Sequence, residues 1–263
     1  MLYIRKRKTP VYIKQAAEKL KSAEENRYNE LCLPDDAGKL RSIFEDMPRS
    51  VIGKALCTEQ HGLCAYCMSQ IRSEGKKNIR IEHYKALSRN KETALDYQNF
   101  LGVCSGGEKE GKGKSHILCC DAARKETELT INPWDKRQMQ AIGYRRNGQI
   151  FVHADPGLAP QLVEKMQTDM DEVLMLNGKL DADGKTKFDT STRLVASRRS
   201  IYQSVCTQFE RWDRKKCLTA DFLQEKINAL EKELQGDETA EPFIGVRLYW
   251  YRRKCRQLSR RKK

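Results

Sequence analysis

Four cysteines in the first half of the chain constrain its fold more than any other feature. Cys64 and Cys67 are separated by two residues, and Cys104 and Cys120 follow later in the chain. A C-x-x-C pair lets two thiolates of one turn bind a single tetrahedral zinc ion, and two further thiolates complete the coordination. The sequence therefore predicts a structural zinc site that joins segments distant along the chain.

Residues that suit metal-assisted chemistry lie among these cysteines. Glu82 and Asp121 offer hard oxygen ligands for Mg²⁺ or Mn²⁺. His83, next to Glu82, can take a proton near neutral pH, and Asn99 is the best candidate to orient its ring. A divalent ion would stabilise the charge on a scissile phosphate, while His83 removes a proton from the attacking water. These residues predict a one-metal nuclease site.

Apolar patterning predicts an α+β fold that is predominantly helical. Ile79 and Ile81 alternate with polar neighbours, and a second apolar run at 100–103 ends at Cys104. We therefore expect a two-stranded hairpin with a long connection. A zinc-stabilised ββα-metal core would follow if a helix starts at Asp121, where a negative charge is favoured.

Further elements are expected on both sides of this core. The helix that starts at Asp121 should stop at Asn132-Pro133, residues 142–153 should form a small hairpin around Asn147-Gly148, and residues 181–187 should form a polar linker between two helices. Helical periodicity marks five stretches, at 11–31, 37–58 with an interruption near Pro48, 162–174, 194–212 and 222–234.

These patterns divide the chain into three regions. Residues 1–58 form a basic N-terminal segment with helices, and residues 59–135 form the metal-binding core. Residues 136–263 form a C-terminal hairpin and helical region with a basic tail. At 263 residues the chain can bury one substantial core or two modest ones.

Positive charge is concentrated at the two ends. The formal net charge is +14, and residues 243–263 contain nine basic residues and no acidic one. Arg5, Lys6, Arg7 and Lys8 add a second basic block, so the ends account for nearly all of the excess. Such blocks favour polyanions, most often phosphate backbones, although a solvated tail that keeps the protein soluble is the alternative. The expected nucleic-acid contacts are Lys112, Lys114, Lys125, Arg252, Arg253, Lys254 and Arg256.

Membrane and secreted classes are disfavoured. No apolar run approaches the roughly 20 residues that span a bilayer, and the N-terminus lacks the apolar region of a secretory signal. We expect a soluble, cytoplasmic protein with no membrane partner. Its ten cysteines are then reduced thiols, four of them in the metal site.

The order of these motifs resembles the HNH, or His-Me finger, endonucleases. More narrowly, the chain looks like the PtuB family, the HNH subunits of Septu and some retron anti-phage systems. The residues that carry this likeness are Leu-Cys-Ala-Tyr-Cys at 63–67, Glu82-His83, Leu-Asp-Tyr-Gln-Asn at 95–99, Cys-Ser-Gly-Gly at 104–107, Cys120-Asp121 with Lys125, and Ile-Asn-Pro at 131–133.

This resemblance implies an activity and partners that residue spacing cannot provide. It implies a metal-dependent cut in phage or host nucleic acid, either DNA or tRNA, during antiviral defence. It also implies control by a PtuA-like ATPase, and in some systems by a retron reverse transcriptase with its DNA–RNA hybrid.

The chain departs from the general HNH pattern in two places. A Gly/Lys-rich loop opens the second cysteine pair, so Cys119, Cys120 or His116 could be the fourth zinc ligand. Cys120 is preferred because it places Asp121 where the general motif has its Asn or His metal ligand. Glu82 stands where the general motif more usually has Asp, and its side chain is longer.

A different class of protein also fits part of the sequence. A non-catalytic zinc-stabilised module that binds nucleic acid, or docks an ATPase, would use the cysteines for folding and His83 for structure alone. Such a module has no use for Glu82 and Asp121, which repel phosphate unless a cation lies between them. The two acidic residues therefore favour the nuclease.

Overall fold

A β-hairpin with a long connection lies at the centre of the molecule. In the computed structural model, which describes residues 1–74, 79–108 and 116–261, β1 (Arg80–His83) pairs antiparallel with β2 (Phe100–Val103). Glu82 faces Leu101 and His83 faces Phe100 across the pair. The connection contains two short 3₁₀ turns, η3 (Lys91–Thr93) and η4 (Tyr97–Asn99). The predicted hairpin is therefore present.

The helix that follows the hairpin is shorter than predicted. Helix α4 (Asp121–Arg124) makes a single turn, so the expected extension to Asn132-Pro133 is wrong. Lys125 has a φ of 56°, in the left-handed region, which ends the helix. The side chain of Arg124 then donates from Nε to the carbonyl of Thr127 at 2.8 Å.

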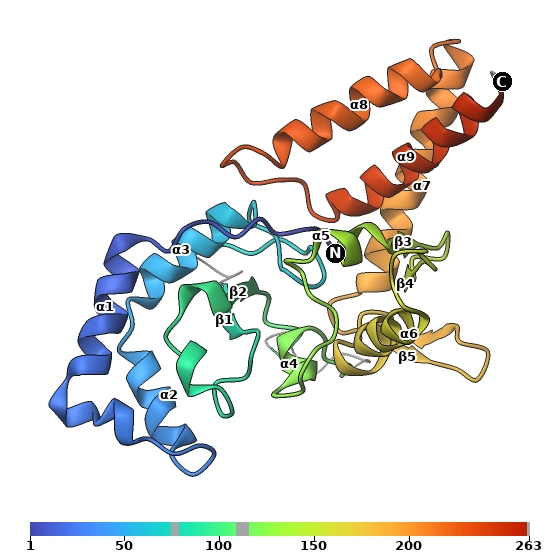
Figure 1. Ribbon diagram of the computed structural model, residues 1–263. Helices are drawn as coiled ribbons and strands as arrows, with labels where there is room; N and C mark the ends of the chain where they lie inside the picture. The colour runs from blue at the N-terminus through green and yellow to red at the C-terminus, as the bar shows by residue number, and fades with distance from the viewer. Residues whose placement is uncertain (75–78, 109–115, 262–263) are drawn as a thin grey trace.

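Three N-terminal helices cover one side of the hairpin (Figure 1). They are α1 (Val11–Ser22), α2 (Ala37–Glu45) and α3 (Arg49–Glu59), with short 3₁₀ turns η1 (Glu24–Asn26) and η2 (Tyr28–Glu30) after α1. The predicted break falls between α2 and α3 at Pro48. Their buried faces, with Ile13, Leu40 and Leu56, form a hydrophobic cluster that includes Phe100 of β2.

Two more hairpins follow the core. After α5 (Lys136–Gln140), strands β3 (Ile142–Tyr144) and β4 (Ile150–Val152) pair as predicted. Helix α6 (Pro160–Thr168) continues into the π-helical turn η5 (Asp169–Val173). The segment predicted as a plain linker instead lies in a hairpin of β5 (Lys179–Leu180) and β6 (Thr186–Phe188). The carboxylate of Asp181 accepts hydrogen bonds from the amides of Asp183 and Lys185, which forms the turn.

The last three helices form an elongated arm (Figure 1). They are α7 (Leu194–Arg214), α8 (Ala220–Glu233) and α9 (Ile244–Arg261). Their aromatic side chains interlock, because Trp212 contacts both Phe222 and Tyr251 at ring distances of 5.1 and 5.7 Å. Among the described residues, no helix is both long and apolar enough to cross a membrane.

The hydrophobic core is continuous across the predicted division at 135/136. One cluster contains Tyr66 and Met68 of the cysteine region together with Met170, Leu194 and Tyr251 from the C-terminal region. The first part of the expected basic tail therefore lies in the core, on the buried face of α9. The division of the chain into three regions stays a prediction.

Candidate metal centre

The four predicted cysteines come together in a buried cluster. The sulfur atoms of Cys64, Cys67, Cys104 and Cys120 all lie within 4.8 Å of one another. The Sγ atoms of Cys64 and Cys120 are 3.9 Å apart, and those of Cys67 and Cys104 are 3.8 Å apart. A zinc tetrahedron with Zn–S bonds of about 2.3 Å has sulfur–sulfur edges of about 3.8 Å. The cluster is therefore consistent with a structural zinc ion.

Backbone hydrogen bonds attach the first two ligands to the hairpin. The amide of Met68 donates to the carbonyl of Cys64 at 3.0 Å, and the amide of Ser69 donates to the sulfur of Cys67 at 3.4 Å. The amide of Ala65 donates to the carbonyl of Gly102 in β2 at 3.0 Å. The turn at 64–69 is thus fixed beside the strand that leads to Cys104.

A glycine lets the two later ligand segments approach each other. Gly106 has a φ of 62°, and a Cβ at this position would lie 2.1 Å from the carbonyl oxygen of Cys119. The amide of Cys119 donates to the carbonyl of Gly106 at 2.9 Å. This close approach brings Cys120 to Cys104, although 15 residues separate them in the sequence.

The structure separates the three candidates for the fourth ligand. Cys120 belongs to the cluster, and its amide donates to the carbonyl of Leu174 at 2.9 Å. The sulfur of the neighbouring Cys119 is not a member of this set and lies 3.4 Å from the hydroxyl of Thr192. His116 is exposed and is not a member of the cluster. The geometry therefore agrees with the choice of Cys120.

Burial disfavours charged thiolates in this cluster unless a cation is bound. Burial raises the pKa of the Cys64 thiol well above its usual value, because a thiolate there loses its hydration. A bound divalent ion stabilises thiolates and releases their protons. The spacing of the four sulfur atoms is thus consistent with a metal ion, whose charge would offset the cost of burying thiolates.

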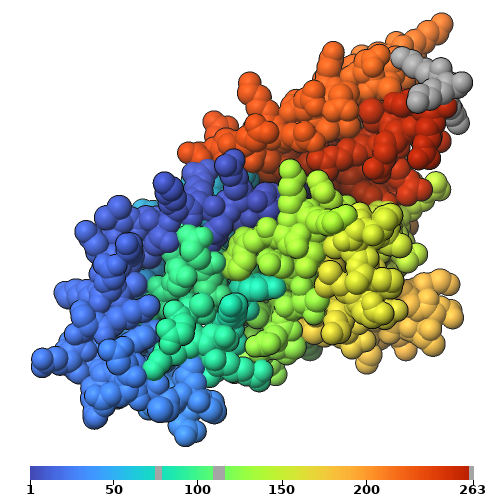
Figure 2. All heavy atoms as spheres, viewed as in Figure 1, coloured from blue at the N-terminus to red at the C-terminus, as the bar shows by residue number. Residues whose placement is uncertain are grey.

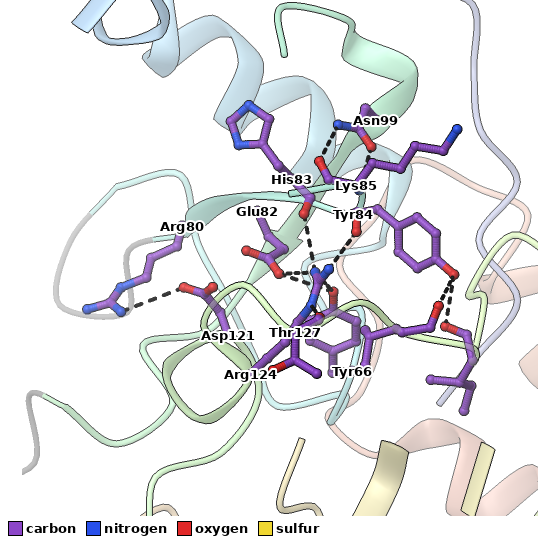
Figure 3. A network of polar contacts seen from close by, with 12 residues as sticks. Tyr66, Arg80, Glu82, His83, Tyr84, Lys85, Asn99, Asp121, Arg124 and Thr127 are labelled. Carbon is purple, nitrogen blue, oxygen red and sulfur yellow. Dashed lines mark hydrogen bonds and ion pairs between the residues drawn. The ribbon is translucent and has the colours of Figure 1, made fainter. Parts of the chain in front are cut away.

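The carboxyl groups of Glu82 and Asp121 face each other beside this cluster (Figure 3). Glu82 comes from β1 and Asp121 from the first turn of α4. Burial raises the pKa of Glu82, the neighbouring Asp121 carboxyl adds to the effect, and Arg124 opposes it. Asp121 is partly exposed and lies 3.9 Å from the guanidinium of Arg80. Two carboxylates in this arrangement offer oxygen ligands to a divalent ion.

Sequence reasoning missed the buried residue that organises the acidic pair. Arg124 is ion-paired with Glu82, and its side chain has no exposed surface. Its guanidinium also donates to the hydroxyl of Tyr66 at 3.1 Å and to the carbonyls of His83 and Tyr84 at 3.2 and 2.5 Å. The sequence had pointed to the adjacent Lys125, which is exposed. Because basic residues are rarely buried, residue type alone gave no signal for Arg124.

His83 lies on the opposite side of β1 from the Glu82 carboxyl (Figure 3). Its ring packs edge-on against Phe44 and Phe100, with ring centroids 4.5 and 5.0 Å away. Nε2 is 2.9 Å from the carbonyl of Ala94, so Nε2 carries the proton and Nδ1 keeps the lone pair. Burial lowers the pKa of His83 to about 4, which keeps the ring neutral near pH 7.

Asn99 fixes the long connection instead of contacting the His83 ring. Its side-chain oxygen accepts from the amide of Lys85 at 2.8 Å, and its nitrogen donates to the carbonyls of Lys85 and Thr93 at 3.0 and 3.2 Å. The predicted direct orientation of His83 by Asn99 is therefore replaced by the Ala94 carbonyl, one residue after Thr93. Asn99 orients the ring only through the segment that it holds.

The basic residues predicted to contact nucleic acid are distributed over separate surfaces. Lys112 and Lys114 lie outside the described residues. Lys125 is exposed at the end of α4. On α9, Arg252 is exposed and ion-paired with Glu231 at 2.6 Å, whereas Arg253 and Arg256 are exposed. Lys254 is half-buried over the ring of Phe209, 5.9 Å from its centroid.

Comparison with known proteins gives a partial match. No model of a known protein family matches the chain. Over 60 residues the chain is 35% identical to an Escherichia coli protein named "Retron Ec83 putative HNH endonuclease". The match covers 21% of this chain and 23% of that protein. This distant similarity, limited to a segment, is in keeping with a nuclease.

Proposed function

We propose that the protein is a metal-dependent endonuclease of the HNH type. The observation that supports this most is the pair of carboxyl groups of Glu82 and Asp121, which meet beside a buried four-cysteine cluster. The similarity to a named retron HNH endonuclease points to the same class. Zinc at the cysteines would hold β2 and the start of α4 together, and would leave the acidic pair free to bind a second ion.

Each residue of the site has a separate proposed task. Glu82 and Asp121 would hold Mg²⁺ or Mn²⁺, and such an ion would stabilise the charge on the scissile phosphate and the leaving oxygen. His83 acts as the base through Nδ1, because Nε2 is already bonded to the Ala94 carbonyl. For this task the backbone at the end of β1 must rearrange, because His83 and Glu82 lie on opposite faces of the strand.

Substrate and partners form a further part of the proposal. We infer that the substrate is DNA or tRNA and that the setting is antiviral defence. A PtuA-like ATPase, and a retron reverse transcriptase with its DNA–RNA hybrid, are the proposed partners. These assignments rest on the resemblance of the motifs.

Two observations favour the rival, non-catalytic function. Arg124 is already ion-paired with Glu82, and the His83 ring packs edge-on against two phenylalanines. A site of this kind is stable without a second ion, as expected for a binding module. The rival therefore predicts zinc in the protein, no binding of Mn²⁺ at the acidic pair, and no cleavage.

The deciding experiment measures cleavage and ion binding on the same samples. The purified protein, with and without a PtuA-like ATPase, is incubated in Mg²⁺ or Mn²⁺ with labelled duplex DNA, single-stranded DNA and total tRNA. Asp121→Ala should abolish cleavage and weaken Mn²⁺ binding in electron paramagnetic resonance titrations. His83→Ala should lower the rate by about 10²–10⁴-fold while zinc content is unchanged.

The matched control is Glu128→Gln, which changes an exposed carboxylate beyond the end of α4. This variant should cleave and bind Mn²⁺ as the wild type does. Full cleavage by Asp121→Ala would remove the acidic pair from the mechanism. Full cleavage by His83→Ala would leave the water without a protein base and return His83 to a structural role.

A further inference from the structure

The first twelve residues expose an unusual set of side chains. Five large hydrophobic side chains are exposed among the described residues, and three of them are Tyr3, Val11 and Tyr12. Tyr3 is 44% exposed and Tyr12 is 61% exposed. They lie at the two ends of a stretch that has four basic residues and no acidic one. We call residues 3–12 the basic-aromatic strap.

The strap is fastened to the body of the protein over its length. The amide of Ile4 donates to the carbonyl of Pro133 at 2.9 Å, and the amide of Arg7 donates to the carboxylate of Glu59 at 2.7 Å. The side chain of Gln98 donates to the carbonyl of Arg7 and to the hydroxyl of Thr9 at 2.9 and 3.1 Å. Its exposed side chains are therefore presented from a fixed backbone.

Burial alternates along the first part of the strap. Ile4 is buried and Lys6 is largely buried, whereas Tyr3, Arg5 and Arg7 are exposed. The ammonium of Lys6 bonds to Glu59 at 2.8 Å and to the carbonyl of Phe100 at 2.7 Å. Lys6 is thus an internal anchor, and the outward side chains carry the remaining charge.

Arg5 and Lys8 keep their charge available. Within the described part of the chain, no carboxylate lies within ion-pair distance of either side chain, whereas Arg7 is paired with Asp237 at 2.5 Å. Both Arg5 and Lys8 are exposed. Figure 2 shows the N-terminal residues at the surface between the first helices and the arm. Two aromatic rings and two available cations therefore share one outward-facing strap.

We propose that the basic-aromatic strap binds a single-stranded nucleic-acid segment. Tyr3 and Tyr12 stack on unpaired bases, while Arg5 and Lys8 contact the phosphates between them. Aromatic rings beside cations are the general chemistry of single-strand binding, because every base has a face that can stack. Paired bases are stacked on each other and cannot use such rings.

The strap also lies close to the candidate metal centre. Lys6 bonds to the carbonyl of Phe100, and Phe100 is the residue of β2 that pairs with His83. A strand held on the strap would therefore be delivered beside the hairpin that carries Glu82 and His83. This proposal rests on the proposed nuclease function for its purpose, but the binding itself does not require cleavage.

The test measures binding in the absence of added divalent ions, so that no cleavage occurs. Fluorescence anisotropy follows labelled oligothymidylate, oligouridylate and a duplex DNA of mixed sequence, with the full chain. The double variant Tyr3→Ala with Tyr12→Ala should lose at least about fivefold in affinity per ring for the single strands, and little for the duplex. The double variant Tyr3→Phe with Tyr12→Phe should bind as the wild type does, because the rings remain.

Charge and ring controls come from the β5–β6 hairpin. Phe188→Ala removes an aromatic side chain that is 51% exposed, and Lys179→Gln with Lys187→Gln removes two exposed charges. These variants should leave binding unchanged. Arg5→Gln with Lys8→Gln should lower the slope of log affinity against log salt by roughly 0.7 for each phosphate that the variant no longer neutralises.

Four results would overturn the proposal. The first is wild-type affinity in the variant with Tyr3→Ala and Tyr12→Ala, and the second is an equal loss of affinity by that variant for single strands and for duplex. The third is an equal loss of affinity in the Phe188→Ala control. The fourth is a wild-type self-association in sedimentation that this double variant loses, which would assign the rings to a contact with a second copy of the chain. If the nuclease proposal fails but the strap proposal holds, single strands bind through the strap and are never cut. If the strap proposal fails but the nuclease proposal holds, the strap variants still cut nucleic acid and bind it with wild-type affinity.

Discussion

At the scale of single residues, Arg124 is the most consequential side chain of the site. A buried carboxylate such as Glu82 is costly unless a cation or several donors compensate it. Arg124 supplies this compensation, and its other donors hold the backbone carbonyls of His83 and Tyr84. The orientation of β1 at the metal centre therefore depends on a side chain that touches neither the cysteines nor solvent.

Removing this cation should destabilise the fold strongly. Arg124→Met leaves Glu82 buried and unpaired, so the free energy of unfolding should fall by about 3–5 kcal/mol. Arg124→Met combined with Glu82→Gln should recover a large part of that loss, because no buried charge remains. Urea denaturation with saturating zinc, analysed as a double-mutant cycle, measures both effects.

The control for this cycle is an exposed ion pair on the same side of the protein. Arg41 and Glu126 are 3.6 Å apart, and their side chains are 57% and 51% exposed. Arg41→Met should change the free energy of unfolding by less than about 1 kcal/mol. An equal cost for Arg41→Met and Arg124→Met would show that the pair with Glu82 is not what stabilises the site.

The residues of the site were predictable to different degrees. The four clustered cysteines and the proposed ligands Glu82 and Asp121 were proposed from residue type and order, because metal ligands require particular donor atoms. The contact of Asn99 was predicted with the wrong partner, since a side-chain amide can bond to many backbone groups. Arg124 was missed because its importance comes from burial, which residue type does not reveal.

At the scale of elements, short structures that carry little stability alone are joined by the cysteine cluster. β1, β2 and α4 each have only four residues. An isolated hairpin or helical turn of this length is marginal in water. Zinc in the cluster would therefore contribute directly to folding of the hairpin and α4.

Two cysteine substitutions should distinguish a zinc ligand from a nearby cysteine that does not bind zinc. Cys64→Ser should lose zinc and unfold the region around the hairpin, because one tetrahedral ligand is removed. Cys119→Ser should retain one zinc per chain, because the Cys119 sulfur lies against Thr192. Metal analysis and thermal unfolding measure both. Absence of zinc from the wild type would refute the cluster as a zinc site.

Helix α9 serves the core and the surface at once. Leu248, Tyr249, Trp250 and Tyr251 are buried, so truncation after Val246 would remove core as well as charge. The charge is therefore tested by Arg253→Gln with Arg256→Gln, at two exposed positions. Nucleic-acid affinity should fall most at low salt, with a slope reduced by roughly 0.7–0.9 for each phosphate that is no longer neutralised.

Stability should be unaffected by these two surface substitutions, within about 0.5 kcal/mol. The Lys179→Gln with Lys187→Gln variant is the matched control for charge. Binding titrations over a range of salt concentrations give the slopes. An unchanged slope would return the basic end of α9 to the role of a solvated surface.

At the scale of the whole molecule, the C-terminal region completes the metal centre. The amide of Cys120 donates to Leu174, and both carboxylate hydrogen bonds of Asp169 come from the amides of Thr130 and Ile131, at 2.6 and 2.7 Å. These contacts cross the predicted division at 135/136. The segment that carries Cys120 and Asp121 is therefore supported by residues far along the chain.

A fragment of residues 1–135 should consequently bind zinc less tightly, and be less well ordered, than the full chain. It lacks the Leu174 carbonyl and the Asp169 carboxylate, so its zinc affinity should be weaker and the amides of Cys120, Thr130 and Ile131 should exchange faster. Competition with a chromophoric chelator and hydrogen exchange measure these properties. A fragment with full-length affinity and protection would instead establish the predicted division as a boundary between independent domains.

The sequence by itself determined the kinds of chemistry available and the local elements that carry them. C-x-x-C spacing, apolar alternation and helical periodicity act over a few residues, so two of the three hairpins, most helices and the first cysteine pair could be predicted directly, whereas three candidates stayed open for the fourth sulfur or nitrogen ligand. Only the tertiary structure decided that Arg124 pairs with Glu82 and that the His83 ring lies on the opposite face of β1 from the Glu82 carboxyl. It also decided that one face of α9 packs in the core. Those outcomes depend on which groups lose contact with water together, and that is a property of the whole packed chain.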